Sequence, residues 1–144
     1  MLLIFITMLL NACAAPKFQN FTQSVRDAKL NDNYFIAHDG AHLPIRIWKS
    51  NGLKPQAIII AVHGFNDYSN FFRTAGNFLA KKNITTYAYD QRGFGAAPNA
   101  GLWPGVDALI KDLINLTSIV RIRHPETPLY LLGESMGGGV IMAT

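Results

Sequence analysis

The residues best suited to chemistry lie near the end of the 144-residue sequence, where Gly133, Ser135 and Gly137 form the pattern G-x-S-x-G. A serine hydroxyl can attack an ester or amide carbonyl and form a covalent acyl intermediate. Small residues on either side allow a strand to turn sharply into a helix, which lifts the serine hydroxyl clear of the backbone. The pattern therefore indicates Ser135 as a nucleophile. The structural alternative is a helix start capped by Ser135 beside packing glycines.

A second candidate segment, H-G-F-N-D at residues 63–67, follows a run of apolar residues. The tetrahedral intermediate of acyl transfer needs backbone N–H donors that are already in place. Met136, directly after the nucleophile, can supply one amide, and Phe65 can supply the other. His63 could be the catalytic base, but in folds built around such a turn the base follows the nucleophile in the chain. We therefore expect His63, beside Gly64, to shape the loop through a hydrogen bond.

A third segment, Y-D-Q-R-G-F-G at residues 89–95, also follows an apolar run. Its glycines could indicate a phosphate-binding loop, but no Lys-Ser/Thr pair follows them and the pattern G-x-G-x-x-G is absent from the sequence, so nucleotide binding gains no support. We expect Asp90 and Arg92 to form a structural ion pair that holds this loop near the site.

The elements that must position these residues alternate along the chain. Three apolar runs, at 57–62, 84–89 and 128–132, read as buried parallel strands, and helices are expected over 68–83, from 106 to His124, and from Met136 onward. Two earlier runs flank Asp39-Gly40 and predict an antiparallel hairpin. Strands that alternate with helices predict an α/β fold with a doubly wound, mostly parallel sheet.

The composition fits one folded domain, with 49% hydrophobic residues, 15% charged residues and a formal net charge of +4. There is no collagen-like or heptad repeat, and a single cysteine rules out a disulfide framework within one chain. The basic residues are scattered and form no stripe, so we expect no nucleic-acid partner. No metal site is predicted.

The N-terminus has the pattern of an export signal. The apolar run at residues 2–10 is too short to span a bilayer, which takes about 20 helical residues, but it suits a signal peptide over 1–12. The sequence L-N-A-C that ends at Cys13 resembles the lipobox of bacterial lipoproteins, in which the cysteine is lipidated. We therefore expect a membrane-anchored cell-envelope protein, with 13–32 as a linker and the domain at 33–144. The alternatives are an ordinary secretory or periplasmic protein and a misassigned start codon.

Taken together, H-G-F-N-D, Y-D-Q-R-G-F-G and G-E-S-M-G-G resemble the α/β-hydrolase superfamily over residues 33–144. More narrowly, they are similar to its monoacylglycerol lipase and lysophospholipase branch, which is also classed with the serine aminopeptidase S33 domain. The resemblance implies Ser135 as nucleophile and the amides of Phe65 and Met136 as the oxyanion hole. It also implies a cofactor-free esterase that acts on a lipid or another small ester.

The nine residues after Ser135 include no acid and no histidine, and all four histidines precede it. In this architecture the acid and the base follow the nucleophile. We therefore expect an inactive N-terminal half of a hydrolase, truncated after the nucleophile turn by a frameshift, a premature stop or an incomplete gene model, with an exposed apolar edge at 129–132. The alternatives are a non-enzymatic envelope lipoprotein, a half-domain completed by a C-terminal half on another chain, and a peptidase or acyltransferase on the same fold.

Overall fold

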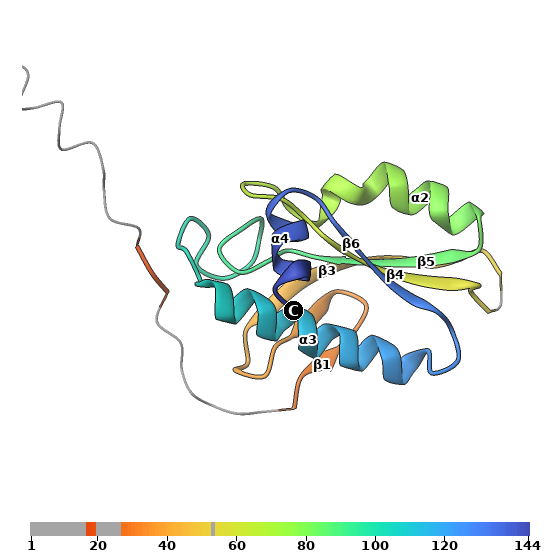
Figure 1. Ribbon diagram of the computed structural model, residues 1–144, viewed down its shortest axis with the longest axis horizontal. Helices are drawn as coiled ribbons and strands as arrows, with labels where there is room; N and C mark the ends of the chain where they lie inside the picture. The colour runs from red at the N-terminus through yellow and green to blue at the C-terminus, as the bar shows by residue number, and fades with distance from the viewer. Residues whose placement is uncertain (1–16, 20–26, 53) are drawn as a thin grey trace, which may run out of the picture.

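The computed structural model describes residues 17–19, 27–52 and 54–144. These residues form a sheet in the order β1-β2-β3-β5-β4-β6, with helices on both faces (Figure 1). The strands are β1 (Lys29–Leu30), β2 (Tyr34–Ile36), β3 (His42–Trp48), β4 (Ala57–Val62), β5 (Ile84–Tyr89) and β6 (Leu129–Gly133). The helices are the 3₁₀ turn η2 (Ser69–Phe72), α2 (Arg73–Lys81), α3 (Val106–Arg123) and α4 (Met136–Met142). The predicted signal segment 1–12 and Cys13 lie outside the described residues.

The centre of the sheet is parallel, as the sequence predicted. Strand β4 pairs in parallel with β5 on one side and with β6 on the other. Alternate residues of β4 face opposite sides of the sheet. Ile58 and Ile60 pack with the α3 side chains, whereas Ala61 packs with Phe72, the residue directly before α2. Because both faces are covered, this strand needs the continuous β-branched run that its sequence shows.

The predicted hairpin around Asp39-Gly40 is confirmed. Strands β2 and β3 are antiparallel, with Tyr34 opposite Pro44 and Ile36 opposite His42. Gly40 has φ +86° in the turn, a conformation that glycine adopts without strain. Strand β3 then pairs antiparallel with β5, which joins the hairpin to the parallel strands. The sheet also begins earlier than expected, since β1 lies in the segment predicted as a linker and pairs with β2.

The helices follow the predicted order with one difference. The segment predicted as a single helix over 68–83 is divided into η2 and α2. Helix α3 ends at Arg123, immediately before His124 and Pro125, as expected of a residue before proline. Its buried apolar side chains, Leu109, Leu113, Leu116 and Val120, cover the β4 face of the core.

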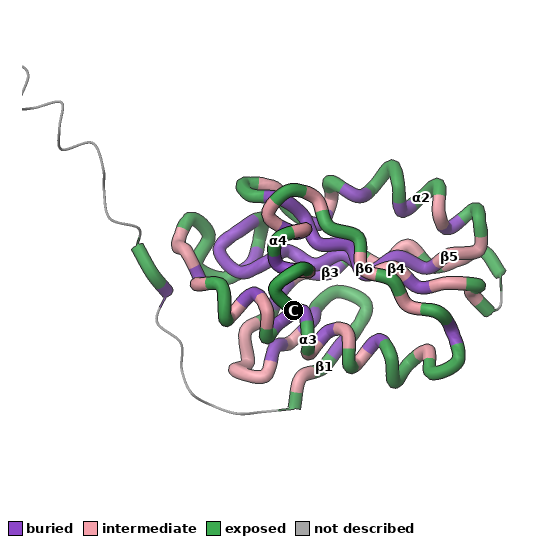
Figure 2. The backbone as a smooth tube through the Cα atoms, viewed as in Figure 1, coloured by how far each residue is buried: buried purple, intermediate pink, exposed green. Residues whose placement is uncertain are grey.

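Strand β6 has an exposed face, in agreement with the expected apolar edge at 129–132. Leu129 and Leu131 pack against the α3 layer, but Tyr130 is 59% exposed and Leu132 is 41% exposed on the opposite face. Among the described strands, β6 pairs with β4 alone, so it forms an edge of the sheet. Figure 2 shows exposed residues along this strand. The predicted parallel pairing and the expected exposed edge at 129–132 are thus both present, whereas the full burial that the apolar run alone suggests is not.

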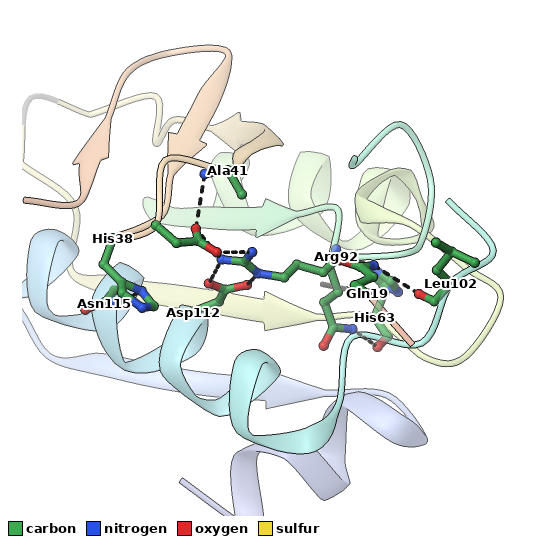
Figure 3. Close-up of polar contacts among 10 residues, drawn as sticks. Gln19, His38, Ala41, His63, Arg92, Leu102, Asp112 and Asn115 are labelled. Carbon is green, nitrogen blue, oxygen red and sulfur yellow. Dashed lines mark hydrogen bonds and ion pairs between the residues drawn. The ribbon is translucent and has the colours of Figure 1, made fainter. Parts of the chain in front are cut away.

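Arg92 ties three distant parts of the fold together. It follows β5, and its guanidinium donates hydrogen bonds to Asp112 of α3, with Nε at 2.6 Å and Nη2 at 2.9 Å. The same guanidinium donates to Asp39 in the hairpin turn, with Nη1 at 2.6 Å and Nη2 at 2.8 Å (Figure 3). Burial alone would raise the pKa of Asp39, but the hydrogen bonds from Arg92 and from the Ala41 amide outweigh burial and lower it.

The predicted ion pair between Asp90 and Arg92 is wrong. The Asp90 carboxylate instead accepts hydrogen bonds from the backbone amides of Ser69 and Ala96, both at 2.9 Å. These amides occupy the carboxylate oxygens, while Arg92 is engaged with acids that lie 53 and 20 residues away along the chain. Asp90 therefore joins the loop after β5 to the start of η2, and Arg92 joins it to the hairpin and α3.

Replacing Arg92 tests the importance of this link. We expect Arg92→Met to lower the free energy of unfolding by about 3–5 kcal/mol, because two carboxylates lose their buried partner. Lys54→Met is the matched control, since it removes an exposed ion pair with Glu126 and is expected to cost at most about 1 kcal/mol. Urea denaturation followed by circular dichroism measures both values. Equal losses in the two variants would contradict the proposed role of Arg92.

Candidate functional site

Ser135 occupies a sharp turn between β6 and α4. Its backbone has φ +48° and ψ −113°, and α4 begins at the next residue. A non-glycine residue with positive φ is strained by about 1–3 kcal/mol and persists only where its surroundings impose it. The Ser135 side chain is exposed at the end of the parallel strands. The predicted strand–turn–helix arrangement is therefore present.

Glycines allow this turn to pack directly on the end of β4. A Cβ at Gly137 would overlap the Val62 carbonyl oxygen, and one at Gly64 would overlap the Glu134 carboxylate and lie 3.3 Å from the Cβ of Ser135. A Cβ at Gly133 would lie 2.5 Å from the amide nitrogen of Gly138. The structure thus brings together the predicted glycines 64, 133 and 137 around the serine.

Two backbone amides beside Ser135 are available to a ligand. Phe65 follows Gly64, and its amide donates no hydrogen bond to another residue in the described ranges. Met136 follows Ser135 as the first residue of α4, so its amide has no acceptor one helical turn earlier. Such donors, fixed before the reaction, are what a developing oxyanion requires.

His63 is a structural element of the loop after β4. Its Nε2 accepts a hydrogen bond from the Gln91 amide at 2.9 Å, and therefore its Nδ1 carries the proton and donates to the Gly64 carbonyl at 2.8 Å. The Gln91 side chain in turn donates to the His63 carbonyl at 2.7 Å (Figure 3). Burial lowers the pKa of His63, so the ring is neutral near pH 7. Both ring nitrogens are occupied, which leaves neither free to take a proton from Ser135.

The other three histidines lie against other elements. His38 Nδ1 is 3.1 Å from the Asn115 side-chain nitrogen, His124 Nε2 is 2.9 Å from the Tyr87 hydroxyl, and the His42 ring packs edge-on against Tyr34. No histidine in the described part of the chain makes a hydrogen bond with Ser135. Within the described residues, the structure thus brings Ser135 close to Gly64 and to the start of α4, and it places no histidine in hydrogen-bond contact with Ser135.

A pocket of about 440 Å³ opens beside Phe65. It lies between the loop after β4 and the loop after β5, and Phe94, Leu102 and Trp103 form much of its wall. Sequence reasoning missed Leu102 and Trp103 because the segment 91–105 has a turn-like composition without periodicity. Their place in the pocket wall next to the candidate site becomes apparent only in the folded structure.

Neither a metal centre nor a membrane-spanning helix is found in the part of the chain that the structure describes. No three side chains of His, Cys, Asp or Glu gather there in an arrangement that could hold an ion. No helix among these residues combines the length and the apolar character needed to cross a bilayer.

Comparison with known proteins assigns the family. The family model described as "Serine aminopeptidase, S33" matches residues 53–144. The chain belongs to this family. Monoglyceride lipase of Rattus norvegicus is 28% identical over 108 residues, which cover 74% of this chain and 35% of that protein. The putative monoglyceride lipase of Schizosaccharomyces pombe is 34% identical over 71% of this chain and 28% of that protein. This chain is thus a member of the monoacylglycerol lipase branch of the α/β-hydrolases. It spans about a third of the length of these relatives.

Solved structures confirm the fold. A soluble variant of monoglyceride lipase from Saccharomyces cerevisiae superposes with a TM-score of 0.63 at 21% identity, over 90% of this chain and 42% of that one. An α/β-hydrolase from Penicillium sp. gives 0.65 at 21% identity, over 78% and 40% respectively. The predicted α/β-hydrolase architecture, with its hairpin and parallel strands, is therefore shown.

The buried state of His63 predicts a pH dependence of stability. The unfolded imidazole titrates near about pH 6.5, whereas the folded one titrates lower, so the unfolded state binds more protons as the pH falls and stability decreases. We expect the free energy of unfolding to drop between about pH 7.5 and about pH 5.5. In His63→Asn, which keeps a donor for Gly64 but cannot titrate, the drop is expected to be smaller. Urea denaturation at both pH values gives the comparison.

His42→Asn is the control for this prediction, because His42 is exposed on β3. It is expected to show the wild-type drop. If His63→Asn loses as much stability on acidification as the wild type, His63 is not the source of the pH dependence.

Proposed function

We propose that this chain carries the nucleophile and the oxyanion hole of an ester hydrolase that acts on lipid esters of the monoacylglycerol or lysophospholipid kind. The observation that carries the proposal is the strained backbone of Ser135, at φ +48°, with its side chain against Gly64. Membership of the monoacylglycerol lipase branch supports ester hydrolysis over the other chemistries of the fold.

In the proposed reaction, Ser135 Oγ adds to the carbonyl carbon of the ester while its proton passes to a general base. The carbonyl oxygen becomes an oxyanion that accepts hydrogen bonds from the amides of Phe65 and Met136. Loss of one such donor typically costs about 10²–10³ in rate. Collapse of the intermediate expels the alcohol, which takes up the proton, and leaves an acyl group on Ser135. Water then attacks the acyl group and gives a proton to the general base. The carboxylic acid leaves, and Ser135 Oγ takes that proton back.

We propose that none of the four histidines of this chain acts as the general base. His63 uses both ring nitrogens in the loop after β4, and His38, His42 and His124 contact side chains on other elements. In this fold the acid and the histidine follow the nucleophile in the chain. We therefore propose that the chain becomes catalytic only when an acid and a histidine are placed beside Ser135, by a continuous or a separate polypeptide.

Chemical rescue tests this proposal on the chain itself. Without an added base, we expect p-nitrophenyl butyrate hydrolysis to equal that of Ser135→Ala. With imidazole in solution, the chain is expected to exceed Ser135→Ala in the same buffer by about tenfold or more, since general-base catalysis is typically worth 10²–10⁴. Mass spectrometry should then detect a butyryl group on Ser135.

An aminoacyl p-nitroanilide distinguishes ester from peptide chemistry. We expect no imidazole-dependent release of nitroaniline. Cleavage of the anilide but not of the ester would favour an aminopeptidase and contradict the proposal. Ser135-dependent turnover without imidazole would contradict the conclusion that the base lies elsewhere.

A further inference from the structure

The pocket beside Phe65 has the shape of a binding site for an apolar group. Its volume of about 440 Å³ falls within the range of small-molecule pockets, about 300–1,000 Å³. The rings of Phe65, Phe94 and Trp103 and the side chain of Leu102 supply its apolar wall, and glycines 93, 95 and 101 line it without filling it. Phe65 belongs both to this wall and to the proposed oxyanion hole, so an ester held at Ser135 has the pocket next to it.

The loop that forms the far wall is held closed by its own backbone. The Gly101 amide donates to the Gly93 carbonyl at 2.8 Å, and the Leu102 amide donates to the Asn99 carbonyl at 3.0 Å. The first bond joins the two ends of the loop, and the second closes a turn at its C-terminal end. The pocket is therefore formed before a ligand arrives, which reduces the entropy lost on binding.

Residues 17–19 bring an exposed lysine to the lining of this pocket from a remote part of the chain. The Trp103 amide donates to the Lys17 carbonyl at 2.9 Å, and the Gln19 amide donates to the Trp103 carbonyl at 3.1 Å. The buried Gln19 side chain also donates to the Leu102 carbonyl at 3.0 Å (Figure 3). Three hydrogen bonds thus fix the backbone on both sides of Phe18 along the loop, and Lys17 lines the pocket.

Lys17 is the only ionisable side chain among the residues that line the pocket. Within the described ranges it forms no ion pair with an acid. A cation that lines a largely apolar pocket and pairs with no carboxylate in the described residues favours a ligand that is apolar along its length and negative at one end.

We infer that this pocket holds an apolar arm of the ester and that Lys17 selects arms that end in a carboxylate or a phosphate. The inference rests on the proposed function, which places the reacting carbonyl at Ser135 beside Phe65. Lys17 is a specificity residue in this account, since it contacts the far end of the ligand and not the reacting atoms.

Binding to the full chain in a Ser135→Ala background tests the inference without any turnover. The probes are octyl phosphate, octanoate and 1-octanol, and binding is followed by the fluorescence of Trp103. The substitution Trp48→Phe removes the second tryptophan, which packs on the opposite face of the sheet. Lys17→Gln is compared with Lys111→Gln, which removes the same charge from the exposed side of α3.

We expect both anionic probes to bind more tightly than 1-octanol, and Lys17→Gln to weaken the anions by roughly three- to tenfold while leaving 1-octanol unchanged. Lys111→Gln should change none of the three. Loss of affinity for only one anion identifies the terminal group that Lys17 prefers. Equal affinities for anionic and neutral probes, equal effects of the two lysine variants, or no binding would each overturn the inference.

The outcome is independent of the chemical rescue. If rescue fails while the anions bind through Lys17, the ester hydrolase proposal falls and the binding site stands. If rescue succeeds while no probe binds, only the role of the pocket is refuted. A second measurement needs no lysine variant. In the chain that retains Lys17, high salt is expected to weaken the binding of octyl phosphate and to leave the binding of 1-octanol unchanged.

Discussion

Close packing of the β6–α4 turn on the end of β4 is the constraint on which the candidate site depends. The turn can approach this strand closely because Gly137 has no side chain to meet the Val62 carbonyl, and the Glu134 amide donates to the Val62 carbonyl at 3.0 Å across the contact. This contact restricts the backbone at Ser135 and holds it at a positive φ despite the strain. The same approach brings the Phe65 amide beside the serine. One steric condition therefore sets the positions of both the proposed nucleophile and the proposed oxyanion donor.

The rest of the fold supplies rigid ends for the loops that meet at this point. The parallel strands β4, β5 and β6 end at the same side of the sheet, where ligands of open α/β sheets bind. His63 and Gln91 join the first two loops through backbone and side-chain hydrogen bonds. Asp90 fixes the second loop to η2, and Arg92 fixes it to the hairpin and α3. His63, Asp90 and Arg92, whose residue types also occur in catalytic sites, thus hold the loops in place.

Local patterns in the sequence predicted the elements and the serine turn well, because hydrophobic periodicity and glycine spacing are properties of short segments. Partners far apart in the chain were not predictable. Arg92 binds Asp39 and Asp112 instead of its sequence neighbour Asp90, since only the folded topology brings those acids together. Lys17 lay in a segment read as a linker, and its place at the pocket depends on pairing with Trp103. The exposure of Tyr130, by contrast, agrees with the exposed apolar edge expected at 129–132.

The central claim, that Ser135 and the amides of Phe65 and Met136 form a preorganised site for a tetrahedral oxyanion, is tested most directly by boron NMR. An alkylboronic acid accepts the Ser135 oxygen, releases a proton to solvent and becomes a tetrahedral anion in the geometry of the intermediate. This account predicts a ¹¹B signal of tetrahedral boron with the 144-residue chain and none with Ser135→Ala. A boronic acid that stays trigonal with the folded wild-type chain, or that reacts equally with Ser135→Ala, would contradict it.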